Sequence, residues 1–429
     1  MMVSQKLLIL GVDRNYWSAT TKSNNTANAW NVDLANGNTN NNNKNNPNNT
    51  VRCVRALPPP ALGLIGGNIL QIMETIFTLQ KIYKAYRDCI KGKKNTTNAL
   101  SFEVYREKNL PALLTELQNR TYKISRYIYF IVTEPSTREI FAADFRDRVV
   151  HHLLYNEIRP IFEATFIEHS YANRVGKGTH AAVRQLCQDM RYTNRFGDGW
   201  CLKLDVRSFF RSIDKNILYS LIKDRIDAVM REEKVWYDEI LWLCRRVIFH
   251  DPTSNYIYKG RLCLKSLIPK SKSLFFSRGT GVPIGNLTSQ FFANIYLNEL
   301  DQFITKWLGC TRYVRYVDDF VMMDEDKDKL NLYIRQIDNF LIVTLNLHIH
   351  PRKIYLQPAL HGIDFLGYFI KPTHTLVRQS VVRRFKDKLY HRRNQNDGLF
   401  SVDDIPMIKS YLGHFGHANT YNLREHLSH

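Results

Sequence analysis

Three aspartates stand where short apolar runs of the sequence end or turn. Asp205 closes the run 200–205, and Asp318 and Asp319 interrupt the apolar stretch 312–323. An acid at such a place is common as an ordinary turn or capping residue. However, crowded carboxylates among apolar neighbours repel one another unless a cation neutralises them. A hard divalent ion with oxygen ligands meets that need, and we expect Mg²⁺, with Mn²⁺ as a substitute.

Two such ions require carboxylates from separate strands. In a two-metal site the ions lie about 3.5–4 Å apart and hold the attacking and leaving oxygens of a displacement reaction. The pattern predicts a catalytic centre of Asp205, Asp318 and Asp319, and we place Val206 among the metal-binding positions. The ring of Phe210 either packs in the core or lies under the sugar of an incoming nucleotide. There it would clash with a 2′-hydroxyl and select deoxynucleotides.

The periodicity of the chain predicts the elements that hold these residues. Residues 200–205 form a strand, and residues 312–323 alternate as two strands around an Asp-Asp turn. Apolar residues at helical spacing predict helices, and an α+β fold follows in which an antiparallel sheet is backed by helices. The main predicted helices cover 141–163, 215–244, 289–308 and 328–345.

The composition favours a nucleic-acid partner. Of 429 residues, 60 are Lys or Arg and 40 are Asp or Glu, which gives a net charge of +20. Basic grooves bind polyanions by releasing counterions, and aromatic rings among them stack on bases; the alternative is a solvated basic surface. Seven scattered cysteines argue against a disulfide framework and against a zinc site. No stretch suits a membrane span, so we expect a cytoplasmic protein without a membrane partner.

The N-terminal part differs in character from the rest. Residues 15–49 contain fifteen asparagines, which disfavour helix interiors and strands. We expect residues 1–72 to be disordered and the folded part to begin at Met73. A featureless disordered tail and a genuine binding module are two alternative explanations of this segment.

An ordered set of motifs over about 125–370 resembles the seven-motif core of reverse transcriptases. The signature is the Tyr-x-Asp-Asp sequence at 316–319, and further matches lie at 138–141, 145–152, 170–180, 203–210, 281–290, 351–353 and 364–368. The resemblance implies a right-hand polymerase with fingers and palm over 73–370 and a short helical thumb over 371–429. Its partners would be a template RNA, a primer or cDNA, and deoxynucleotide triphosphates.

The resemblance also implies roles for individual residues. Those expected to bind the nucleotide are Arg138, Arg148, Phe210, Ile284, Gly285, Gln290 and Lys353. Those expected to form the primer grip are Phe365, Leu366 and Gly367.

Two features resemble the reverse transcriptases of diversity-generating retroelements. Ile284-Gly285 and Ser289-Gln290 stand where many relatives read Gln-Gly and Ser-Pro. The asparagine-rich segment resembles a translated template repeat and spacer. The resemblance implies copying with errors at adenines, a bacterial or phage-borne element, and a small basic helical-bundle accessory protein. A retron or group II intron-like enzyme is the alternative of the same class, and a catalytically silent RNA-binding scaffold is the alternative of another class.

Overall fold

The computed structural model describes residues 15–22, 25–33, 39–43, 75–91, 96–277, 279–395 and 399–428. The chain divides into two units, Met1–Met73 and Glu74–His429, and this division lies one residue from the expected boundary at 72/73. The first unit contains a three-stranded antiparallel sheet in the order β1-β2-β3, where the asparagine-rich composition predicts no strand. Its strands are β1 (Asn15–Lys22), β2 (Asn25–Asp33) and β3 (Thr39–Asn43). The expected spacer before Met73 lies outside the described residues.

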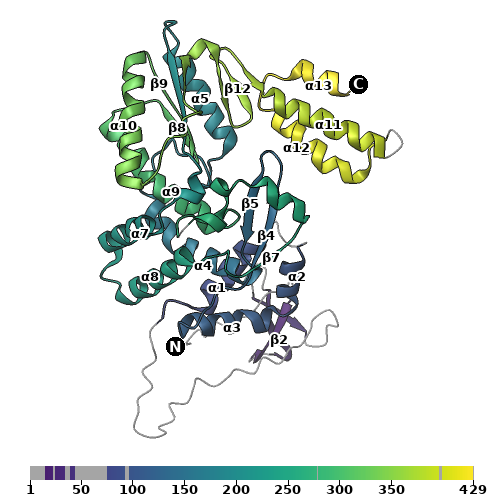
Figure 1. Cartoon of the computed structure of the whole chain (residues 1–429). Coiled ribbons are helices and arrows are strands. Elements are labelled where there is room, and N and C mark those ends of the chain that lie inside the picture. Colours follow the sequence, from purple (N-terminus) through teal and green to yellow (C-terminus); the bar gives the residue numbers. More distant parts are fainter. Residues whose placement is uncertain are drawn as a thin grey trace. The chain divides into compact units, whose positions relative to one another are not determined.

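The second unit is built around a four-stranded antiparallel sheet in the order β10-β6-β9-β8 (Figure 1). Its strands are β6 (Trp200–Asp205), β8 (Tyr313–Tyr316), β9 (Asp319–Asp324) and β10 (Tyr355–Pro358). Successive side chains of a strand point to opposite faces. Cys201 and Val321 therefore pack with α5 (Thr179–Thr193), whereas Leu202 and Phe320 pack with α9 (Leu287–Gln302) and α10 (Lys327–Leu345).

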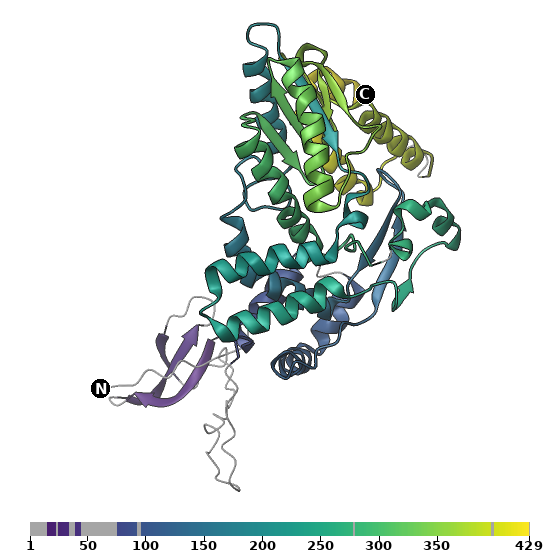
Figure 2. The same ribbon diagram turned by 60° about the vertical axis from the view of Figure 1, so that its left-hand side comes forward.

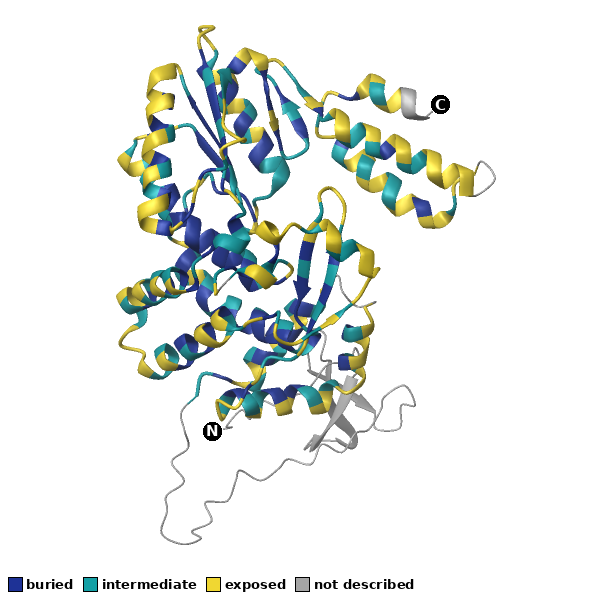
Figure 3. Ribbon diagram, viewed as in Figure 1, coloured by how far each residue is buried: buried dark blue, intermediate teal, exposed yellow. Residues whose placement is uncertain are grey.

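Both faces of this sheet are thus covered. Figure 3 shows the strands in the colour of buried residues, and Figure 2 shows α10 lying across one face while the C-terminal helices lie beyond the other. Because the faces are closed, polar groups of the sheet reach a ligand only where the strands end.

Two smaller sheets complete the unit. One has the order β5-β4-β7, in which β4 and β7 are parallel, and the other is the antiparallel sheet β11-β12-β13. Their strands are β4 (Tyr127–Val132), β5 (Arg138–Ala142), β7 (Tyr256–Tyr258), β11 (Ile363–Phe365), β12 (Tyr368–Ile370) and β13 (Thr375–Val377).

The remaining helices pack around these sheets or follow them. The α-helices are α1 (Leu79–Ile90), α2 (Thr97–Val104), α3 (Arg106–Gln118), α4 (Phe145–Glu163), α6 (Phe209–Ser212), α7 (Lys215–Met230), α8 (Lys234–Phe249), α11 (Gln379–Gln395), α12 (Ile405–Phe415) and α13 (Tyr421–Ser428). The shorter turns are η1 (Leu262–Leu267), η2 (Lys270–Lys272), η3 (Leu274–Phe276), η4 (Phe303–Trp307, a π-helical turn), η5 (Ala359–His361) and η6 (Val402–Asp404). Within the described residues, no helix is long and apolar enough to cross a bilayer.

The predicted elements of the second unit differ from the structure at their ends and, for one helix, in its middle. The helix predicted over 141–163 begins at Phe145, because the Asp144 side chain accepts a hydrogen bond from the Arg146 amide and caps it. The strand β5 occupies the residues before it. The helix predicted over 215–244 is two helices, α7 and α8. The helix predicted over 289–308 ends at Gln302 and continues as the π-helical turn η4.

Candidate active site

The three aspartates come together at one end of the central sheet. Asp205 is the last residue of β6 and lies directly opposite Asp319, the first residue of β9. Asp318 lies in the two-residue turn between β8 and β9, since Tyr316 pairs with Asp319. The amide of Val206 donates a 3.3 Å hydrogen bond to the main-chain carbonyl of Asp318. Two segments that are about a hundred residues apart in sequence thus meet through their main chains as well as their side chains.

The Asp-Asp turn has a strained backbone. Val317 has a φ of +58°, a left-handed conformation that a β-branched residue rarely adopts. Such outliers persist only where the surrounding structure holds them. Here the fully buried Arg315 donates a 3.0 Å hydrogen bond from Nη1 to the carbonyl of Val317.

Arg315 is itself held by a network of buried polar groups. Its Nε and Nη2 donate to the two carboxylate oxygens of Asp301, at 2.6 and 2.5 Å, and both side chains are fully buried. Nη2 also donates to Ser170 Oγ at 3.1 Å, and Tyr313 donates its hydroxyl to Asp301 Oδ1 at 2.8 Å. The network ties the Asp-Asp turn to α9.

The electrostatics of the site agree with crowded carboxylates. Burial, with the negative charge of Asp205 as the next contribution, raises the pKa of Asp318 to about 6. Burial also raises the pKa of Asp319, although Lys203 opposes the shift. Lys203 Nζ lies 3.1 Å from Asp319 Oδ2, and Lys353 Nζ lies 2.7 Å from Asp205 Oδ2. Two lysines therefore compensate part of the negative charge.

The donor set suits a divalent cation. Asp319 Oδ1 is buried and has no hydrogen-bond partner among the described groups, so this carboxylate oxygen is an unsatisfied acceptor. Among those described groups, no three His, Cys, Asp or Glu side chains already converge as a preformed metal site. The carboxylates instead engage the lysines, and a cation would take the place of that positive charge.

The predicted nucleotide-binding turn is joined to two neighbouring elements. The amide of Val282 donates to the carbonyl of Phe210 at 2.8 Å, and the amide of Phe141 donates to the carbonyl of Ile284 at 3.0 Å. Gly285 has a φ of +120°, and a Cβ there would lie 2.8 Å from Ile140 Cγ2, so only glycine fits. Ile284 thus lies between β5 and the short helix that carries Phe210.

The other predicted nucleotide-binding residues lie on these same elements. Arg138 begins β5 and donates from Nε to Ser136 Oγ, and Arg148 lies in the first turn of α4 and donates from Nε to the carbonyl of Ala143. Gln290 lies in the first turn of α9. Of the predicted nucleotide-binding residues, all of which are described, Lys353 alone has a side chain that forms an ion pair with the acidic site, at Asp205.

The predicted primer-grip residues form the turn between β11 and β12. Phe365 pairs with Tyr368, and the two residues between them, Leu366 and Gly367, have φ values of +51° and +89°. Positive φ at both central residues is the pattern of a type I′ turn. Lys203 Nζ donates to the carbonyl of Asp364 at 2.8 Å and therefore links this turn to Asp319.

The family assignment rests on these motifs and on comparison with known proteins. The family model described as reverse transcriptase (RNA-dependent DNA polymerase) matches residues 133–370. The chain belongs to the reverse transcriptase family. The expectation of an RNA-directed DNA polymerase is confirmed at the level of this family.

Several known proteins resemble this reverse transcriptase. Protein YkfC of Escherichia coli is 22% identical over 287 residues, which are 59% of this chain and 67% of YkfC. The group II intron-encoded protein LtrA of Lactococcus lactis is 20% identical, covering 70% of this chain and 57% of LtrA. The putative COX1/OXI3 intron 2 protein of Saccharomyces cerevisiae is 20% identical over 72% of this chain and 39% of its own length. The chain thus spans between 39% and 67% of these relatives.

Among solved structures, apo telomerase from Candida tropicalis truncated from the C-terminal domain is similar, with a TM-score of 0.43 and 12% identity over 59% of this chain and 55% of that one.

Two residues of this site were not predicted from the sequence. Lys203 stands two positions before Asp205 on the same strand, and Arg315 stands on β8, three positions before Asp318 in the turn that follows. The available signal was strand alternation, which places Lys203 on the same face as Asp205. The partner of Arg315, Asp301, lies on α9, and no sequence pattern links the two.

Proposed function

We propose that this chain synthesises DNA on an RNA template for a diversity-generating retroelement. In this proposal, residues 73–370 are fingers and palm, and α11 to α13 form a short thumb. The observation that carries the polymerase assignment is the register that sets Asp205 opposite Asp319 with Asp318 on the adjoining turn. Carboxylates from two strands in one place are what two-metal phosphoryl transfer needs.

Asp205, Asp318, Asp319 and the main chain of Val206 would hold two Mg²⁺ ions. When bound, the ions supply Lewis-acid stabilisation of the oxygens that attack and leave. The chain's own contribution is position and charge. Arg315 holds the Asp-Asp turn through Val317, and Lys353 brings a positive charge next to Asp205, where a triphosphate would bear its negative charge.

The other predicted residues would bind the nucleotide and the primer. Arg138 and Arg148 would bind phosphate oxygens, since a guanidinium group presents several donors in a fixed plane. Phe210 is partly buried beside Phe209, and its ring would exclude a 2′-hydroxyl. Gly285 and Gln290 would line the nucleotide site, and the turn Phe365–Gly367 would support the primer end.

The test of the polymerase assignment is substitution of the aspartates. Asp205→Asn, Asp318→Asn and Asp319→Asn should each lower nucleotide incorporation on a primed RNA by orders of magnitude, because each removes ligand charge. Asp328→Asn is the matched control, since Asp328 is an exposed residue at the start of α10. RNA binding should persist in all four variants. Incorporation near the wild-type rate in Asp318→Asn would refute the assignment.

Ile284 supports the retroelement part of the proposal. It stands where many relatives have a glutamine amide, and its main chain is fixed to β5 by the hydrogen bond from Phe141. An amide there can hydrogen-bond near the sugar, whereas a branched alkyl group cannot. Loss of one such contact is worth about 1–3 kcal/mol, or roughly tenfold to a hundredfold in error rate.

The corresponding experiment compares error spectra. Ile284→Gln should lower misincorporation opposite template adenine more than opposite the other bases, and sequencing of cDNA made on one RNA gives the ratio. Ile284→Leu is the matched control, because it keeps the apolar character. An unchanged adenine fraction in an active Ile284→Gln enzyme would mean that Ile284 does not set the errors.

Residues 1–72 enter the proposal as a translated template repeat and spacer. Adenine-rich near-repeats in the DNA that flanks the gene would support this origin, and their absence would contradict it. The proposed partners also include a small basic helical-bundle accessory protein.

A group II intron-like enzyme is the second candidate function. The observation that favours it is the similarity to LtrA over 70% of this chain. Splicing assistance to a group II intron RNA, measured with purified protein, would separate it from the retroelement proposal.

A further inference from the structure

A second cavity lies away from the acidic site. Its volume is about 620 Å³, within the range of pockets that take small molecules or single nucleotides. It is formed by the segment 122–124, which precedes β4, and by the C-terminal half of α8 together with the two residues that follow. None of the residues assigned above to metal, nucleotide or primer binding lines it.

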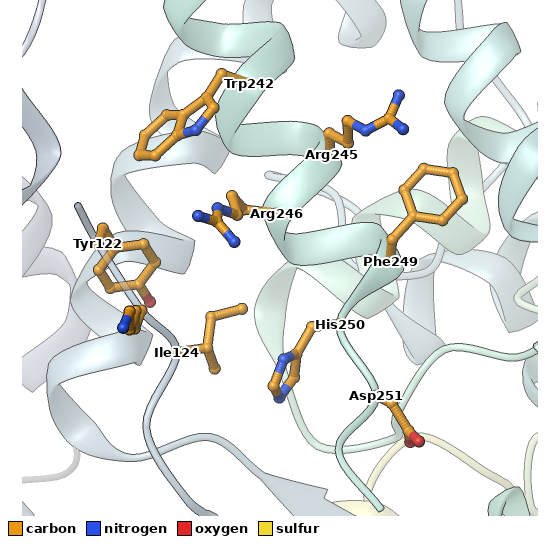
Figure 4. A pocket seen from close by; sticks show the side chains of 9 residues that line it. Tyr122, Ile124, Trp242, Arg245, Arg246, Phe249, His250 and Asp251 are labelled. Carbon is orange, nitrogen blue, oxygen red and sulfur yellow. The ribbon is translucent and has the colours of Figure 1, made fainter. Parts of the chain in front are cut away.

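Aromatic and cationic side chains face the cavity together. Figure 4 shows Trp242, Arg246, Tyr122, Ile124 and His250 around a common space, whereas Asp251 extends away from it. Tyr122 is buried in the wall of the cavity, because its hydroxyl donates to the carboxylate of Asp147 at 2.8 Å and the guanidinium of Arg146 lies over its ring. Flat rings beside guanidinium and ammonium groups are the pattern of single-stranded nucleic-acid sites.

The cations of the cavity are available for a ligand. Lys123 and Arg246 are exposed. Over the residues that the structure describes, their side chains form no hydrogen bond or ion pair with the protein. Arg246 lies in the last turn of α8, where its charge also offsets the partial negative charge of the helix end. The ammonium of Lys215 binds the carbonyl of His250 at 3.2 Å and adds further positive charge at that end.

His250 supplies a polar group without a partner. Its Nε2 is buried and accepts or donates no hydrogen bond among the described groups, while its ring stacks on Tyr127 with centroids 5.4 Å apart. Burial lowers the pKa of His250, so the ring is neutral at physiological pH. His250 therefore contributes a neutral, half-buried ring to the wall of the cavity.

We propose that this cavity is a second binding site for single-stranded RNA, which takes one base against the ring of Trp242 and places the adjoining phosphates on Arg246 and Lys123. In this arrangement the buried Tyr122 and the ring of His250 form part of the wall. A phosphate ion alone would leave most of the volume and the Trp242 ring unused. An acidic peptide would satisfy the cations, but it would leave the indole ring without a stacking partner.

The experiment measures binding in the absence of nucleotides, so that its outcome is independent of polymerisation. The full chain and the variants Arg246→Ala, Lys123→Ala and the double variant are titrated into a fluorescein-labelled oligouridylate at several salt concentrations. Arg335→Ala is the matched control, because Arg335 is exposed on α10, away from this cavity. Each single variant should weaken binding about fivefold and make the slope of log K against log salt shallower by roughly one. The control should change neither quantity.

A second measurement locates the RNA directly. Oligouridylate that contains 4-thiouridine is cross-linked to the wild-type chain, and the cross-linked peptides should include residues 122–124 or 242–250. Wild-type affinity and slope in the double variant, together with no cross-link in these peptides, would overturn the proposal. Retained RNA binding with loss of binding to labelled polyglutamate would also overturn it and would assign the cavity to an acidic protein partner. Thermal melting of each variant verifies that the fold is retained.

Discussion

The buried pair Arg315–Asp301 offers a test of how the Asp-Asp turn is held. Asp301→Asn removes the negative charge while its remaining oxygen can still accept from Tyr313, as Asp301 Oδ1 does now. The guanidinium of Arg315 then stays fully buried with no carboxylate beside it. An uncompensated buried charge of this kind costs about 3–5 kcal/mol of folding free energy.

A double variant separates stability from catalysis. Arg315→Met with Asp301→Asn removes both charges, and the main remaining penalty is an amide N–H without a partner, which costs about 1–3 kcal/mol. The double variant should therefore be about 2 kcal/mol more stable than Asp301→Asn alone. It still lacks the donor to the Val317 carbonyl, so the strained turn loses its support. Misplacement of a catalytic group by about 1 Å lowers the rate by roughly a hundredfold.

The assays are urea unfolding for stability and primer extension on RNA for activity. We expect the double variant to regain much of the stability that Asp301→Asn loses and to extend primers roughly a hundredfold more slowly than the wild type. Extension at the wild-type rate by the double variant would refute the idea that Arg315 positions the Asp-Asp turn. A cost under about 1 kcal/mol for Asp301→Asn would refute the argument from buried charge.

Three further predictions concern stability. Burial lowers the pKa of His151 from 6.5 to about 3, so on acidification this imidazole takes up a proton in the unfolded chain before it does so in the folded chain. The contribution of His151 to the free energy of unfolding is therefore full above pH 6.5 and should fall by about 1.4 kcal/mol per pH unit as the pH drops below that value. His151→Asn should remove this part of the pH dependence in melts recorded from pH 7 to 5. Gly285→Ala should cost about 1–3 kcal/mol in urea unfolding through its positive φ and the contact with Ile140 Cγ2, and Ile140→Val should not restore the loss, since valine keeps Cγ2 and φ is unchanged. Deletion of residues 1–72 should leave both the melting temperature and primer extension unchanged, and a marked fall in either would show that this segment packs on the rest of the chain.

Local sequence signals predicted the central elements well. The strand 200–205 and the paired strands around Asp318 lie where the sequence predicts them, because both faces of the sheet are buried and most side chains in these strands are apolar. Helix ends were less predictable. The start of α4 depends on one capping side chain, Asp144, and the π-helical turn after Gln302 has no sequence signature.

The acidic site could be predicted only in part. The aspartates carry their own signal, since crowded acids in apolar runs need an explanation. The residues that support the aspartates carry no such signal, because Arg315 is held by Asp301 and Lys203 bonds to the carbonyl of Asp364, and both partners lie on other elements. Contacts between distant segments depend on how the elements pack, and one sequence does not contain that information in any local pattern.

The two lysines at the acidic site would make the proposed cation binding there an exchange of one positive charge for another. Lys203 and Lys353 already neutralise Asp319 and Asp205, so an incoming divalent cation competes with ammonium groups rather than with water alone. Its affinity then depends on where each displaced ammonium can go. Lys203 has a second acceptor, the carbonyl of Asp364, and a face of the Phe365 ring 5.7 Å away. On cation binding, the charge released from Asp319 would therefore stay at the turn between β11 and β12, and occupation of the proposed metal site would change the contacts of that turn through a single side chain, Lys203.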